Sequence, residues 1–246
     1  MNKYFYILLF IITTSCGISE DCFKGNGNRT TLTFPYDSFT KVKVYSGVGL
    51  VVKEGPEYEV RIETRDNIKE NIEVVINGDM LVIKDNSSCN IARDYGVTTV
   101  YITAPDLQEI HNKTEQSIRS DGVLHYGLLR LFAIGDDGDD SASGDFHIDL
   151  ESSGQLVVES NTVTNFYING TVGELLLNFY FGDGRFNGKD FEANIIKVYH
   201  RGSNDMIVKP IQRIEGQILS IGNVILKNVP SEIEVEEFFT GQLIYN

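Results

Sequence analysis

Short apolar segments recur roughly every 8–12 residues through the second half of the chain, with Gly, Asn, Asp and Ser between them. This spacing limits the fold more than any other feature of the sequence. Within one segment Phe146, Ile148 and Leu150 alternate with polar residues, a period of two that is typical of a strand with one buried face. No long window keeps the apolar spacing of an amphipathic helix. We therefore expect an all-β fold.

The first half of the mature chain also has strand signals. Val60, Ile62 and Thr64 alternate with charged residues. Asn77-Gly78-Asp79 interrupts two apolar runs, and an Asn-Gly step in that position favours a hairpin because both residues tolerate positive φ. A further strand is expected over residues 97–104, which Pro105 ends.

We favour a right-handed β-helix, a solenoid-like stack of short strands in which each rung rests on its neighbours. A β-sandwich is the alternative, since regular short strands suit both folds. We expect an N-terminal β part over residues 31–115 that continues into a solenoid part over 116–246. The hairpin strands of 31–104 and the strand of 232–239 are expected to cover the two open ends of the stack.

The N-terminus has the pattern of an export signal. Lys3 precedes a nine-residue apolar run over 4–12, too short to span a bilayer, and small residues lead to Cys16. We predict a lipoprotein signal peptide over 1–15, acylation of Cys16, and a flexible tether over 16–30. The predicted location is the outer membrane, facing the periplasm or the cell surface.

The chain carries a formal net charge of −14, which repels phosphate backbones and excludes nucleic acid as an expected partner. The expected partners are the membrane, reached through the lipid anchor, and a glycan or an extracellular protein. The oligomeric state is left open.

If Cys16 is acylated, Cys22 and Cys89 remain as an even pair in an oxidising compartment, which favours a disulfide. Two free thiols are the alternative. Zinc is not expected, because the sequence has no Cys-x-x-Cys pair.

The densest acidic cluster lies in residues 135–140, where four carboxylates on a glycine-bearing turn are of the kind that binds calcium. The alternative is a solvated corner, and no other cofactor is expected. The candidate ligands are Asp136, Asp137, Asp139 and Asp140. Ser141, between Asp140 and Ala142, matches a short O-glycosylation acceptor pattern.

An aromatic stretch and a glycine turn suggest a sugar-binding surface, because aromatic faces stack on sugar rings while Asp and Arg bind hydroxyls. Leu177, Phe179 and Phe181 are expected in the core by alternation, so ordinary packing is the competing interpretation. The candidate sugar-binding residues are Tyr180, Asp183, Arg185, Tyr199 and His200.

No catalytic residue is assigned. The four histidines are scattered, and the sequence has no nucleophile elbow, His-Glu-x-x-His or phosphate loop. A polysaccharide-acting enzyme would need acids stacked on one face of successive rungs, and the sequence alone does not place them there. This interpretation ranks third, after a binding protein and a structural envelope protein that binds itself.

Several motifs in order resemble the head GIN domain family of auto-transporter adhesins. They include residues 39–44 (FTKVKV), 47–55 (GVGLVVKEG), 79–83 (DMLVI), 100–107 (VYITAPDL) and 216–224 (GQILSIGNV). The resemblance implies a secreted or surface β-solenoid with no established reaction, found mainly in Bacteroidetes. The chain departs from the family in its degraded Ser-Gly corner steps, for example at residues 114–117 and 201–204.

Overall fold

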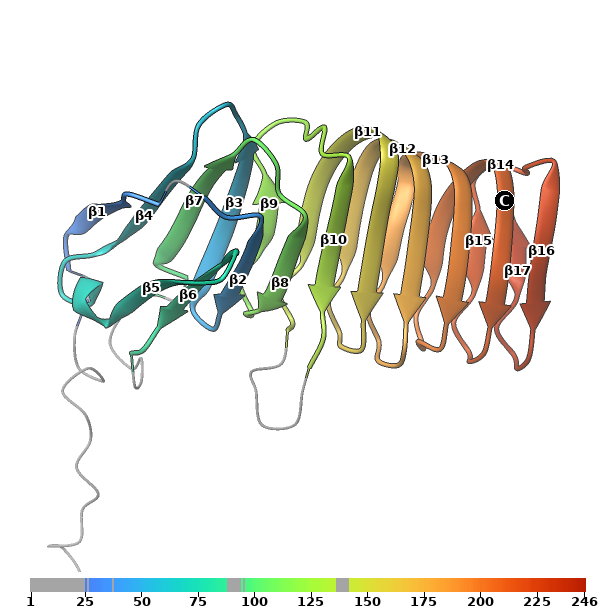
Figure 1. Ribbon diagram of the computed structural model, residues 1–246. Helices are drawn as coiled ribbons and strands as arrows, with labels where there is room; N and C mark the ends of the chain where they lie inside the picture. The colour runs from blue at the N-terminus through green and yellow to red at the C-terminus, as the bar shows by residue number, and fades with distance from the viewer. Residues whose placement is uncertain (1–24, 26, 37, 88–93, 95, 136–141) are drawn as a thin grey trace, which may run out of the picture.

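The computed structural model describes residues 25, 27–36, 38–87, 94, 96–135 and 142–246. Apart from a 3₁₀ turn at Lys69–Asn71, the regular structure in these residues is β-strand. The strands form one continuous curled sheet (Figure 1), so the expectation of an all-β, solenoid-like stack is confirmed.

Four long strands build the regular part of the stack, and each one passes through two facing ladders. They are β11 (Phe146–Ser160), β12 (Phe166–Phe179), β13 (Phe186–His200) and β14 (Met206–Ile218). Neighbouring long strands pair in parallel along both halves, with one or two register shifts along each pair. A rung is therefore one long strand, bent once, followed by a short turn.

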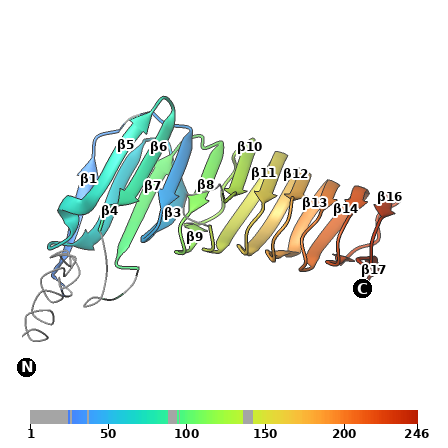
Figure 2. The same cartoon turned by 90° about the horizontal axis from the view of Figure 1, so that it is seen from below.

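The two ladders continue beyond the long strands in both directions, which makes the elongated body seen in Figures 1 and 2. The first ladder includes the second halves of the four long strands. Its other strands are β5 (Ile72–Asn77), β6 (Met80–Asp85), β2 (Lys41–Tyr45), β8 (Glu109–Lys113), β10 (Leu128–Ala133) and β16 (Glu232–Glu237). The second ladder includes the first halves of the four long strands. Its other strands are β1 (Arg29–Phe34), β4 (Glu59–Arg65), β7 (Thr98–Ala104), β3 (Val48–Glu54), β9 (Ile118–Ser120), β15 (Val224–Leu226) and β17 (Leu243–Tyr245).

The core lies between the two ladders and is built from columns of equivalent residues. Phe146, Phe166, Phe186 and Met206 begin successive long strands at intervals of twenty residues, and all four are fully buried. The rings of Phe146 and Phe166 stack with centroids 5.0 Å apart and planes 7° from parallel. Parallel register thus places apolar side chains directly over one another, which is how each rung buries its neighbour's inner surface.

The turns between rungs are held by side chains that bond to the next turn. Asp145 Oδ1 accepts hydrogen bonds from the backbone N–H and the side-chain amide of Asn165, and Asp205 Oδ1 does the same for Asn223. These bonds satisfy backbone groups that the ladder leaves unpaired where each turn enters a strand. Asp145, Asn165, Asp205 and Asn223, each directly before a strand, therefore have a structural role.

The two ends of the stack differ. At the N-terminal end β1, β4 and β7 pair antiparallel, and β5 and β6 form the predicted hairpin with Gly78 at φ 67°. This part covers the core, as the sequence predicts. At the other end β16 pairs in parallel with β14 and lengthens the stack, and its Ile233 and Val235 are partly buried against the core.

The predicted domain limits fall inside continuous structure. β1 begins at Arg29, within the segment 16–30 assigned to the tether. β8 pairs in parallel with both β2 and β10, so the first ladder runs through the predicted limit at 115 and 116 without interruption. In the part of the chain that the structure describes, no helix has the length and apolarity to cross a membrane.

Gly222 provides a test of how tightly the turns stack. A Cβ at this position would lie 2.2 Å from the carbonyl oxygen of Asn204 and 2.5 Å from Nε2 of His200. We expect Gly222→Ala to lower the free energy of unfolding by about 1–3 kcal/mol. Thermal unfolding followed by circular dichroism measures the effect, and Gly127→Ala is the control because a Cβ there meets open space. Equal melting temperatures for both variants would contradict the close stacking.

Candidate functional site

The structure separates the predicted sugar-binding residues. Tyr180 and Tyr199 lie near each other outside the first ladder, with ring centroids 6.1 Å apart, and the Tyr180 hydroxyl donates to Glu159 at 2.6 Å. This hydrogen bond and partial burial raise the pKa of Tyr180 to about 12, with burial as the larger cause. The two tyrosines therefore remain candidates for a binding surface.

Asp183 and Arg185 lie in the turn between β12 and β13, where they bond to the following turn. Asp183 accepts a hydrogen bond from the Ser203 hydroxyl at 2.7 Å, and the Arg185 guanidinium donates to Asn204 Oδ1 at 2.7 Å. Both side chains thus join turns of neighbouring rungs, a role that the sequence did not predict for them.

Two expectations about neighbouring residues are wrong. His200 is fully buried and does not share a surface with Tyr199, because adjacent residues of a strand point to opposite faces. Phe181 was expected in the core but is 58% exposed. β12 ends at Phe179, so the alternation that would bury Phe181 has stopped.

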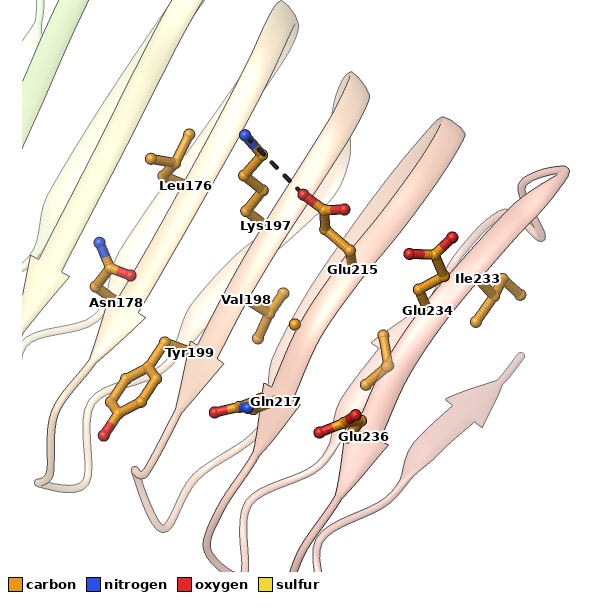
Figure 3. A pocket seen from close by; sticks show the side chains of 12 residues that line it. Leu176, Asn178, Lys197, Val198, Tyr199, Glu215, Gln217, Ile233, Glu234 and Glu236 are labelled. Atoms are coloured by element: carbon orange, nitrogen blue, oxygen red, sulfur yellow. Dashed lines mark ion pairs between the residues drawn. The ribbon is translucent and has the colours of Figure 1, made fainter.

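A groove of about 820 Å³ runs along the outer surface of the first ladder over β12, β13, β14 and β16 (Figure 3). Two rows of outward side chains form its sides, and each row takes one residue from each of these strands in register. The Lys197 row contains Leu176, Lys197, Glu215 and Glu234, and the Tyr199 row contains Asn178, Tyr199, Gln217 and Glu236. The groove therefore follows the stacking direction, across the strands.

The floor of the groove lies at Val198, Gly216 and Val235, which are paired in register between the two rows. Gly216 has a φ of 134°, and a Cβ there would lie 1.9 Å from the carbonyl oxygen of Val198. The position thus requires glycine, and the lack of a side chain keeps the backbone accessible at the middle of the floor.

An ion-pair network runs along the Lys197 side of the groove. Lys197 Nζ lies 2.7 Å from a Glu174 carboxylate oxygen and 4.0 Å from Glu215, a pair drawn in Figure 3. Arg213 contacts Glu215 at 2.5 Å and Glu234 at 2.7 Å. The hydrogen bond from Lys197 lowers the pKa of Glu174, while the same contact raises the pKa of Lys197.

Most of the groove residues were missed in the sequence because they are 18 to 21 positions apart and come together only through register. Lys197, Glu215 and Glu234 show this spacing. The twenty-residue interval between Phe146, Phe166 and Phe186 gives the approximate length of a rung, but the register shifts along the strands mean that it does not give which outward residues are neighbours.

Several predicted sites lie outside the described residues and stay predictions. They are the acylation site Cys16, the cysteine pair Cys22 and Cys89, the calcium ligands Asp136, Asp137, Asp139 and Asp140, and the glycosylation site Ser141. Within the described residues no three His, Cys, Asp or Glu side chains are grouped in a way that holds a metal ion.

Comparison with known proteins identifies the family. A family model described as "Putative auto-transporter adhesin, head GIN domain" matches residues 38–230. The chain belongs to this family. The resemblance seen in the sequence motifs is thereby confirmed, and the matched region spans the strands from β2 to β15. No curated protein matches the chain.

Solved structures of bacterial proteins share the fold. A "putative adhesin" from Bacteroides fragilis matches with a TM-score of 0.78 and 18% identity, over 89% of this chain and 97% of that one. A "putative adhesin" from Parabacteroides distasonis has a TM-score of 0.66 and 13% identity, over 91% and 99%. A "putative lipid binding protein" from the same species has a TM-score of 0.58 and 15% identity, over 89% and 98%.

His200 makes the stability of the stack depend on pH. Burial lowers the pKa of His200 below its ordinary value of 6.5, although the nearby Asn204 backbone and Asp205 act in the opposite direction. Neither ring nitrogen has a hydrogen-bond partner of good geometry in the described residues. The unfolded chain thus binds a proton more readily than the folded one, and the contribution of His200 to stability is lost as the pH falls below 6.5.

We expect the unfolding free energy of the wild type to fall, relative to that of His200→Leu, by at most about 1.4 kcal/mol per pH unit below pH 6.5. Denaturant titrations at a series of pH values measure both proteins. His111, whose pKa burial also lowers, keeps part of the pH dependence in the variant. Parallel curves for the two proteins would contradict the assignment to His200.

Proposed function

We propose that this protein is a lipid-anchored envelope protein that binds an extended glycan in the groove, without catalysis. The observation that carries the proposal is the repetition of outward side chains from rung to rung along the groove. Successive rungs are about 4.8 Å apart, similar to the length of one sugar unit in a linear polysaccharide. A polymer lying along the stack would therefore meet a new set of side chains at each unit.

The groove has the chemistry that sugar hydroxyls need. Asn178 and Gln217 offer both donors and acceptors, Tyr199 offers an aromatic ring, and Glu236 offers acceptors. An acyl chain would leave these polar groups without partners, so the groove suits a glycan better than a lipid. The lipid-binding name of one fold relative therefore does not decide the ligand of this chain.

The charges of the groove favour a neutral glycan or one with amino sugars. Its lining includes the carboxylates of Glu215, Glu234 and Glu236 against the single ammonium of Lys197. The protein as a whole carries a net charge of −14. A sulfated or uronic-acid polymer would be repelled both locally and at long range.

The arrangement of acids supports binding without hydrolysis. A glycosidase needs a carboxylic acid whose pKa is raised, so that it holds a proton to donate. Glu174 has the opposite change, because the hydrogen bond from Lys197 lowers its pKa. Glu215 and Glu234 are each held in an ion pair with Arg213, so both already have a basic partner.

Tyr199→Ala tests the groove as a glycan site. The loss of one stacking ring is expected to weaken binding to a recognised polysaccharide by about tenfold, or about 1.4 kcal/mol. A panel of neutral, amino-sugar and sulfated polysaccharides on an array gives the ligand class, and titration calorimetry gives the affinity. Tyr167→Ala, on the outside of the second ladder, is the matched control and should leave binding unchanged. Equal loss in both variants, or no binding to any member of the panel, would contradict the proposal.

Cys16→Ser tests the lipid anchor separately. Cells that express the wild type are expected to incorporate labelled palmitate into the protein and to keep it in the membrane fraction, because several acyl chains on one cysteine hold firmly. The variant should take up no label and should leave the membrane fraction. Palmitate incorporation that persists in Cys16→Ser would show that the anchor is elsewhere.

A further inference from the structure

The last rung leaves the inner columns of the stack partly uncovered. Ile233 and Leu243 are only half-buried, whereas Ile214 and Val224, their register partners in the preceding rung, are fully buried. Figures 1 and 2 show β16 and β17 at the end of the body, opposite β1. Among the described residues β16 pairs with β14 and has no strand on its other side.

A strand with one free side offers backbone groups to another strand. Along β16, alternate residues point their N–H and C=O groups toward β14, and the residues between point theirs outward. Phe238 and Phe239, directly after β16, are 57% and 65% exposed. The free edge therefore combines unpaired backbone groups with uncovered apolar side chains, the two features used when a sheet takes up a further strand.

The charges on the outer surface indicate what kind of strand fits. Basic and acidic residues contact each other from rung to rung: Lys197 of β13 bonds Glu174 of β12, and Arg213 of β14 bonds Glu232 and Glu234 of β16. β16 then ends this series with glutamates at alternate outward positions. The next strand in the same alternation would carry basic residues opposite them.

We propose that the free edge of β16 binds an extended segment of a partner protein in which lysine or arginine alternates with apolar residues. The basic side chains would pair with Glu232, Glu234 and Glu236 on the outer surface. The apolar side chains between them would cover Ile233 and Val235 on the inner side. The bound segment becomes one more rung of the first ladder. It shares Glu234 and Glu236 with the edge of the groove but does not use Tyr199.

A second copy of this chain fits the edge less well. Pairing of β16 with its equivalent in another molecule would place two rows of glutamates beside each other, an arrangement that like charges destabilise. The same row therefore opposes pairing between identical edges and favours a basic partner.

A synthetic ten-residue peptide of alternating lysine and valine with one terminal tryptophan is the probe. The protein contains no tryptophan, so the fluorescence of the peptide reports binding directly. A control peptide of the same composition has all its lysines first and all its valines last. We expect the alternating peptide to bind at least tenfold more tightly than this control, and to bind more weakly as salt is raised.

The double variant Glu234→Gln/Glu236→Gln should lower the affinity for the alternating peptide at least tenfold. Glu57→Gln/Glu70→Gln changes the net charge equally at exposed positions near the other end of the stack and should bind as the wild type does. Tyr199→Ala should also keep peptide binding, which separates this result from the glycan experiment. Circular dichroism melting confirms that each variant is folded.

Three results would overturn the proposal. They are equal affinity for the two peptides, which would indicate charge attraction alone, unchanged binding by the β16 variant, and no binding of the alternating peptide. Light scattering adds a further test, because a dimer that the alternating peptide dissociates would assign the edge to a second copy of the chain.

Discussion

Parallel pairing in register between rungs is the interaction on which the rest of this structure depends. It places equivalent residues of successive rungs in columns, with about 4.8 Å between rungs, so the kind of side chain at one position must suit those directly above and below it. An inward column must then be apolar throughout, as it is from Phe146 through Phe166 and Phe186 to Met206. An outward column becomes a continuous row of side chains, and two such rows make the groove.

The same register limits side chains at the turns. Gly222 packs against His200 and the Asn204 carbonyl so closely that a Cβ would collide with both. Asp205 bonds the next turn through Asn223. The stack thus excludes bulk at one turn position and requires a short polar side chain at another, which explains why Gly, Asp and Asn recur between the apolar segments. These residues determine how closely the rungs approach, and this role explains their recurrence without a bound ligand.

Local alternation in the sequence is enough to predict strands, but it does not give the register in which those strands pair. The burial of Phe146, Ile148 and Leu150 follows from period two, and the hairpin at Gly78 follows from its turn residues. Phe181 was misplaced because alternation does not show where a strand ends. His200 was wrongly assigned to the same surface as Tyr199, although alternation itself places these adjacent residues on opposite faces of the strand.

The groove residues are a different case, because no local pattern relates positions in different rungs. That Lys197 and Glu215 are neighbours can be predicted only when the bend and turn lengths of each rung are known. Every added or lost residue changes which side chains meet. The family resemblance predicted the fold correctly, but its short motifs contain no information on these outward residues. The fold could therefore be predicted from the sequence, whereas the candidate site could be found only from the register of the strands in the structure.

The two proposed binding surfaces lie at the end of the stack away from its N-terminal strand. The second ladder runs from β1 through β4, β7, β3 and β9 to the long strands and then to β15 and β17, so about ten steps of 4.8 Å separate its ends, on the order of 50 Å. The anchor proposed at Cys16 precedes β1 in the sequence. If the chain is anchored there, the groove and the free edge of β16 would be held far from the membrane on a body whose columns of buried side chains resist bending. Such an arrangement would suit an acidic stack, because a rigid spacer would present its binding groups beyond the anionic headgroups that repel the protein.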